Sequence, residues 1–180
     1  MSKLQRIKCV VWALMMVLFG VILIFFPDEG LMVVATIFGV LLIIAGIRAL
    51  GYYFQMARYM VGGRVVLFRG IILLDLGAFT MTLTDIPRMS LVLYLLGSHA
   101  LAGAVDILRA LEAKRLSSPS WRSAILFGAG NILVAAAAAF CGIKTGEIRI
   151  PMYLYCAGLF HAALGRLRQA FRKTEIIYIP

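Results

Sequence analysis

The most constraining feature of this sequence is a series of long apolar runs separated by short polar segments. A helix needs about 20 predominantly apolar residues to cross the ~30 Å hydrocarbon core of a bilayer. Six runs approach or reach that length, and the last of them is the least apolar. We therefore predict an all-α, polytopic membrane protein with six transmembrane helices, at about residues 9–26, 31–50, 65–84, 89–108, 121–143 and 150–165.

The composition agrees with six crossings and leaves little chain for a second function. Of the 180 residues, 63% are hydrophobic and 14% are charged, whereas soluble domains average about 45–50% apolar and about 25% charged residues. We expect a single membrane domain over residues 1–180 without a soluble catalytic part. The sequence has no Gly-rich phosphate loop, His-x-x-x-His motif or nucleophile elbow. Because Cys9, Cys141 and Cys156 also lack metal-ligand spacing, we expect no enzymatic activity, no cofactor and no metal.

The basic residues indicate how the chain is oriented. The net charge of +10 comes from Lys and Arg in short clusters between the apolar runs, which favours a role in membrane orientation over nucleic-acid binding. Fifteen of the eighteen fall on one side, and only Arg88, Lys144 and Arg149 fall on the other. Since cytoplasmic loops carry the excess, we expect cytoplasmic N and C termini. The alternative for the basic N terminus is a cleaved secretory signal, but the run from Cys9 to Phe26 is longer than a usual signal core.

Glycines recur in a pattern that indicates three helical hairpins, at about residues 9–60, 64–115 and 121–170. In each closing helix a second glycine follows the first by six or seven residues. Small residues on one face let membrane helices approach closely, although glycine is also simply common in such helices. The glycines predicted to pack helices are Gly20, Gly39, Gly46, Gly70, Gly97, Gly103, Gly128, Gly158 and Gly165.

Two segments give the chain a resemblance to a known family. The first hairpin contains LFGVILIFFPDEG followed by IFGVLLIIAGIRAL, and the third opens with PSWRSAILFGAGNILVA. In this order of glycine helix, Phe-Pro turn and paired-glycine helix, the chain resembles the HdeD-like acid-resistance membrane proteins over nearly its whole length. The resemblance implies a small multi-pass protein of the bacterial inner (plasma) membrane, linked to survival at low pH. It supplies no catalytic residues.

Polar residues inside a membrane are costly and are candidates for function. Four such residues lie within the predicted spans: Asp75, His99, Asn131 and His161. The hairpin repeat places the two histidines at similar depth, so one hypothesis is a proton-responsive cluster, because a neutral buried histidine gains charge as acidity rises. The alternative is that each histidine makes one interhelical hydrogen bond and that Asp75 pairs with a donor such as Arg69.

A separate charged pair is expected at the cytoplasmic end of the fourth run. Asp106 lies three residues before Arg109, and residues at that spacing share one helix face. We predict an ion pair between them.

The function that these features favour is that of a non-enzymatic inner-membrane protein in acid or envelope stress resistance. A small transporter or channel is one alternative, and an assembly subunit or scaffold of a membrane complex is another. The expected partners are the lipid bilayer and either a second copy of the chain or another membrane protein, with no nucleic acid.

Overall fold

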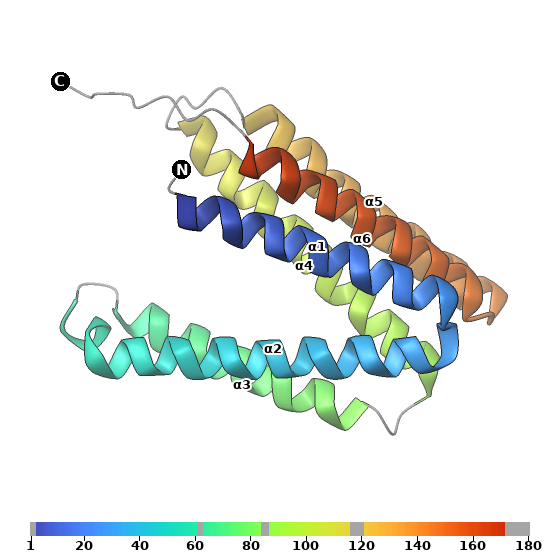
Figure 1. Ribbon diagram of the computed structural model, residues 1–180, viewed down its shortest axis with the longest axis horizontal. Helices are drawn as coiled ribbons and strands as arrows, with labels where there is room; N and C mark the ends of the chain where they lie inside the picture. Colours follow the sequence, from blue (N-terminus) through green and yellow to red (C-terminus); the bar gives the residue numbers. More distant parts are fainter. Residues whose placement is uncertain (1–2, 61–62, 84–86, 116–120, 172–180) are drawn as a thin grey trace. The chain divides into compact units, whose positions relative to one another are not determined.

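The computed structural model describes residues 3–60, 63–83, 87–115 and 121–171. These residues form six α-helices and one short 3-10 helix, η1 (Ala57–Tyr59), as Figure 1 shows. The predicted all-α class is confirmed. The helices are α1 (Lys3–Phe25), α2 (Pro27–Gln55), α3 (Gly63–Thr82), α4 (Arg88–Arg115), α5 (Trp121–Thr145) and α6 (Arg149–Ala170).

Five of the described helices, α1 to α5, are long and apolar enough to cross a membrane. The protein is therefore a multi-pass membrane protein. Helix α6 spans the predicted sixth run but is not among the five, because Arg149, His161, Arg166 and Arg168 dilute its apolar character. Its crossing of the bilayer stays a prediction.

The Pro27 to Gly30 segment differs from its expected conformation. The Phe-Pro turn named above predicts a turn here, but these residues are the first turn of α2, so that Phe26 alone separates α1 from α2. Proline is tolerated at the start of a helix because its missing N–H has no partner to lose there. Asp28 and Glu29 follow in the first turn, where the positive end of the helix dipole favours negative side chains.

Helices α2 and α3 belong to one compact unit, Asp28–Leu91. They pack through glycines: a Cβ atom at Gly46 would lie 3.0 Å from the Gly70 carbonyl oxygen, and one at Gly77 would lie 3.0 Å from the Gly39 carbonyl oxygen. The exposed Asp28 and Arg88 form an ion pair within this unit. The unit thus joins the closing helix of the first predicted hairpin to the leading helix of the second, while the hairpin boundaries themselves stay a prediction.

The second compact unit contains α1, α5, α6 and α4 from Val92 onward. Helix α6 packs against both α1 and α5. Figure 1 shows that α1 begins, α4 ends, α5 begins and α6 ends at the same end of this unit. We call it the basic end, because its described residues include Lys3, Arg6, Lys8, Arg109, Lys114, Arg115, Arg122, Arg166 and Arg168.

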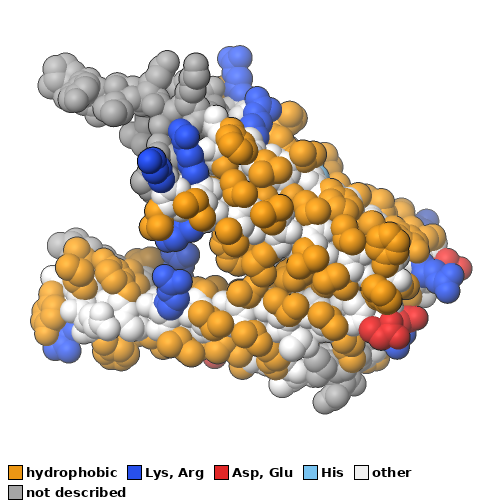
Figure 2. Space-filling model, in the orientation of Figure 1, with side chains coloured by type: hydrophobic (Ala, Val, Ile, Leu, Met, Phe, Trp, Pro, Cys, Tyr) orange, Lys and Arg blue, Asp and Glu red, His pale blue; other side chains and the backbone are white. Residues whose placement is uncertain are grey.

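The surface of this unit fits a lipid environment. Figure 2 shows hydrophobic side chains covering most of its visible face, with several Lys and Arg side chains at the basic end and a smaller group of basic and acidic side chains at the opposite end. Large apolar side chains such as Leu14, Leu101 and Leu133 are more than 60% exposed. Arg172 and Lys173, which were counted with the cytoplasmic charges, lie outside the described residues.

Candidate functional site

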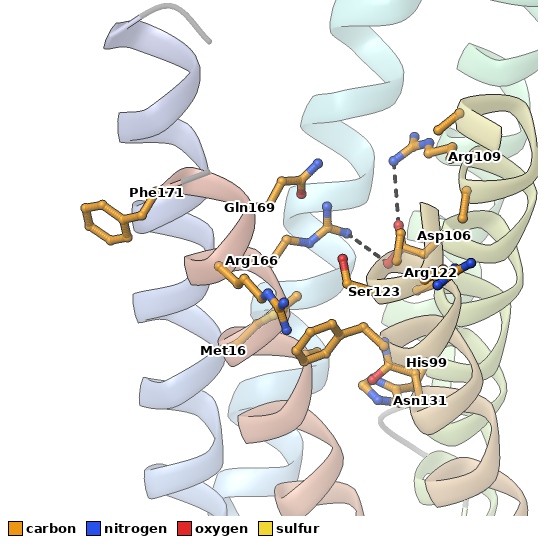
Figure 3. Close-up of a pocket in the computed structure, with 18 residues that line it drawn as sticks. Met16, His99, Asp106, Arg109, Arg122, Ser123, Asn131, Arg166, Gln169 and Phe171 are labelled. Carbon is orange, nitrogen blue, oxygen red and sulfur yellow. Dashed lines mark ion pairs between the residues drawn. The ribbon is translucent and has the colours of Figure 1, made fainter. Parts of the chain in front are cut away.

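A pocket of about 780 Å³ opens in the unit formed by α1, α4, α5 and α6 (Figure 3). Helices α4, α5 and α6 provide most of its lining, and α1 adds Met16. The volume lies within the range of about 300–1,000 Å³ that is usual for small-molecule sites. All of its lining residues belong to this one unit.

The outer part of the pocket is charged. Asp106 lies 3.8 Å from the Arg109 guanidinium and 3.8 Å from the Arg166 guanidinium (Figure 3). The predicted pair of Asp106 with Arg109 is therefore confirmed, and the pair with Arg166 on α6 is an addition. Asp106 and Arg166 are only 27% and 31% exposed, so their charges are partly shielded from solvent.

Two further arginines line the same pocket and lie over aromatic rings. The Arg122 guanidinium is 5.4 Å from the centre of the Trp121 ring, and that of Arg168 is 5.9 Å from the centre of the Phe127 ring. Both distances fall within the range of cation–π attraction. The rings position the two arginine side chains but do not neutralise their charge.

His99 and Asn131 form the buried polar floor of the pocket and lie against each other in Figure 3. They are 8% and 4% exposed. The His99 Nε2 and Asn131 Oδ1 atoms have no hydrogen-bond partner among the described residues. A buried polar atom without a hydrogen-bond partner lowers the stability of the fold by about 1–3 kcal/mol. Both atoms are closed off from the open part of the pocket by the side chains around them.

His161 makes a different contact. Its Nε2 lies 3.3 Å from the backbone carbonyl oxygen of Phe127, which accepts a hydrogen bond when Nε2 carries the proton. The two rings are tilted at 36° to each other, with 5.1 Å between their centres. A Cβ atom at Gly130 would lie 2.5 Å from this Nε2, so a larger residue there would require the imidazole to move. His161 thus joins α6 to α5, close to the polar floor but outside the pocket lining.

Glycines allow α4, α5 and α6 to approach closely enough to form the floor. The ideal Cβ positions of Gly103 and Gly128 each lie 2.7 Å from the other residue's carbonyl oxygen. On α6, a Cβ at Gly158 would lie 3.0 Å from His99 Nε2, and one at Gly165 would lie 3.1 Å from the Phe127 ring. These backbones bring His99 and Asn131 together.

Two of the residues singled out from the sequence lie elsewhere. Asp75 belongs to the other compact unit and is exposed on α3, where it makes no ion pair with Arg69 or any other described residue. Gly97 is exposed on α4 and has no described atom within 4 Å of its Cβ position. The contacts therefore bring together His99, Asn131 and His161 without Asp75, and Gly97 contributes no close helix packing.

Several residues of the site were not singled out from the sequence as site residues. Arg122, Arg166 and Arg168 were counted only for orientation, although their positions at helix ends on one side of the membrane could have suggested a shared site. Gly130 lies in a close helix contact at the site, and Gly77 lies in one within the other compact unit. Neither belongs to the glycine pairs of the predicted closing helices, so the repeat does not point to them. No group of three or more His, Cys, Asp or Glu that could hold a metal ion occurs among the described residues.

Comparison with known proteins gives one match. No curated protein and no solved structure matches the chain. Residues 11–82, less than half of the chain, match the model of a family described as a short repeat of unknown function, DUF308.

Proposed function

We propose that this chain is a non-enzymatic protein of the bacterial inner membrane, of the HdeD-like kind, that contributes to resistance against acid or envelope stress. The matched short-repeat family is that of the HdeD-like membrane proteins, which supports the proposal. The five long apolar helices fit a multi-pass protein. The arginines and lysines at the basic end support a cytoplasmic position for that end and for both termini.

The observation that carries the proposal is the group of His99, Asn131 and His161 between α4, α5 and α6. A proton added to the buried His99 ring would place a positive charge inside this packed unit, where an unpaired charge is costly. The groups around His99 are Tyr155, whose ring centre is 5.9 Å away, with Asn131 and His161; Asp106 lines the same pocket further toward the basic end. Acidity would therefore act directly on the packing of the three helices.

The test is survival after acid shock in a bacterial strain from which the gene has been deleted. The strain carries the wild-type gene, the His99→Phe variant, the His161→Phe variant, or the control Leu133→Phe, which changes an exposed side chain. We expect the control to protect as well as the wild type and both histidine variants to protect less, at equal amounts in the membrane. Full protection by both histidine variants would contradict the proposal.

A small transporter or channel is the second candidate. The pocket supports it, because polar side chains continue from the arginines of the basic end to His99, in the middle of α4. Proteoliposomes should then show flux of protons or anions that is lost in the Asn131→Leu variant. An assembly subunit or scaffold would instead co-purify with a defined membrane complex.

A further inference from the structure

The charge balance of the pocket is strongly positive. Arg109, Arg122, Arg166 and Arg168 line it together with a single carboxylate, Asp106. Asp106 already interacts with two of the four arginines. The guanidinium groups of Arg122 and Arg168 have aromatic contacts but no carboxylate partner among the described residues. The guanidinium N–H groups of Arg122 and Arg168 are therefore available to bind an anion.

Guanidinium groups suit one class of ligand in particular. Their planar, forked donors match the oxygens of phosphate and carboxylate groups, and such charge-assisted hydrogen bonds are about twice as strong as neutral ones. Four arginines against one aspartate favour a group with more than one negative charge over a single carboxylate. A phosphate monoester carries about −1.5 to −2 at neutral pH. Phosphate is the group that meets this excess best.

The deeper part of the pocket is closed over its two buried polar atoms. His99 and Asn131 line the pocket, but their Nε2 and Oδ1 atoms face protein and have almost no surface open to it. Between them and the arginines, small residues such as Ala102, Ala124 and Ala162 leave the space open. The pocket therefore holds its ligand at the arginines, above these two atoms.

We propose that the pocket between α4, α5 and α6 binds a ligand that carries a phosphate group, which the arginines of the basic end hold. The phosphate belongs either to a lipid headgroup or to a free phosphate compound. This inference rests on the proposed function, since it assigns a ligand class to the same site. It states what the site binds, which acid survival does not measure.

The test measures binding to the purified full-length protein in two arms. In the first, radiolabelled inorganic phosphate is equilibrated with the protein in phosphatidylcholine nanodiscs. In the second, native mass spectrometry compares retention of phosphatidylglycerol, whose headgroup is anionic and carries hydroxyl groups, with that of phosphatidylcholine. Binding in the first arm identifies a free phosphate compound, and selective retention in the second identifies a lipid headgroup. Either result supports the site, and binding in neither arm overturns it.

Three variants tie the binding to the pocket. Arg122→Gln and Arg166→Gln each remove one guanidinium, and loss of one charge-assisted hydrogen bond should weaken binding roughly tenfold or more. Ala162→Leu fills part of the pocket without changing its charge and should weaken binding as well. The matched control is Arg149→Gln, which removes the same charge from an exposed position at the opposite end of α6.

The outcomes separate this site from the stress function. Equal binding by the control and by all three pocket variants would overturn the site, because it would show attraction to net charge alone. Folding of each variant is checked by its thermal stability, and a pocket variant that melts like the wild type yet binds less supports the site. Binding without any survival defect in the histidine variants would remove the stress function and retain the phosphate site.

Discussion

The close contact between α4 and α5 gives the sharpest prediction about the fold. In the Gly103→Ala variant, the new Cβ atom would lie 2.7 Å from the Gly128 carbonyl oxygen and 3.0 Å from the Asn131 Cβ atom. Ordinary contact begins at 3.4 Å, so the shortfall from 3.4 Å to 2.7 Å is about 0.7 Å. A backbone oxygen within a helix cannot swing aside as a side chain can. The two helices must therefore separate.

The expected cost follows from this geometry. Forcing extra bulk into a well-packed contact typically costs about 1–3 kcal/mol. Gly103→Ala should therefore lower the free energy of unfolding by about that amount. The matched control is Gly97→Ala on the same helix, where a Cβ atom meets open space. That substitution should leave stability unchanged or slightly raised, since alanine is the better helix former by about 1 kcal/mol or less.

The assay is thermal unfolding of both variants in detergent, read as the fraction that remains monodisperse on size exclusion after heating. We expect the Gly103→Ala variant to lose its folded fraction at a clearly lower temperature than the Gly97→Ala variant. Equal melting of the two would refute the helix contact. Because Asn131 lies beside the new methyl group, the Gly103→Ala variant should also bind phosphate more weakly than the Gly97→Ala variant does.

Three more predictions follow from particular contacts. A Cβ at Gly20 on α1 would lie 2.9 Å from the tip of the Phe160 ring on α6. Gly20→Ala should therefore lower the melting temperature, and adding Phe160→Leu should restore it. A double variant that melts no higher than Gly20→Ala would contradict this contact between α1 and α6. Asp106→Asn should lower stability by up to about 1 kcal/mol, more than Asp28→Asn, whose ion pair is exposed, and added salt should shrink the difference between the two melting curves. Cys156 is buried, so a thiol reagent should label it only after denaturation, and rapid labelling of the native protein would argue against the packing of α6.

The helices could be predicted from the sequence because the bilayer thickness sets the length of an apolar run. Their ends could not, because hydropathy follows apolar side chains and not the backbone. Helix α4 continues to Arg115, past the predicted end at residue 108, and α2 continues to Gln55, past residue 50. Charged and polar residues can extend a helix beyond the hydrocarbon. Pro27 was read as part of a turn although proline also suits a first helical turn.

The site could be predicted only in part. The glycine repeat placed His99 and His161 at similar depth, and both lie beside α5 in the structure. The sequence could not show that a backbone carbonyl at Phe127 is the contact of His161, since every helical residue has a carbonyl group. Nor could it show that Arg166 meets Asp106, because the two lie on different helices and the rotation of each helix about its axis is set by packing. Asp75 was grouped with the histidines by depth alone, although it is exposed on α3.

The central claim is that a polar pocket connects the basic end of the unit with its buried floor. Ala102 lines that pocket, whereas the neighbouring Leu101 is 65% exposed outside it. The most direct measurement compares Ala102→Cys and Leu101→Cys, each in a background where the three native cysteines are replaced by alanine, in inside-out membrane vesicles treated with a membrane-impermeant maleimide. We predict that the Ala102→Cys variant is labelled, that phosphate or phosphatidylglycerol slows the reaction, and that the Leu101→Cys variant stays unlabelled. Labelling of neither variant, or of both at the same rate, would contradict the account.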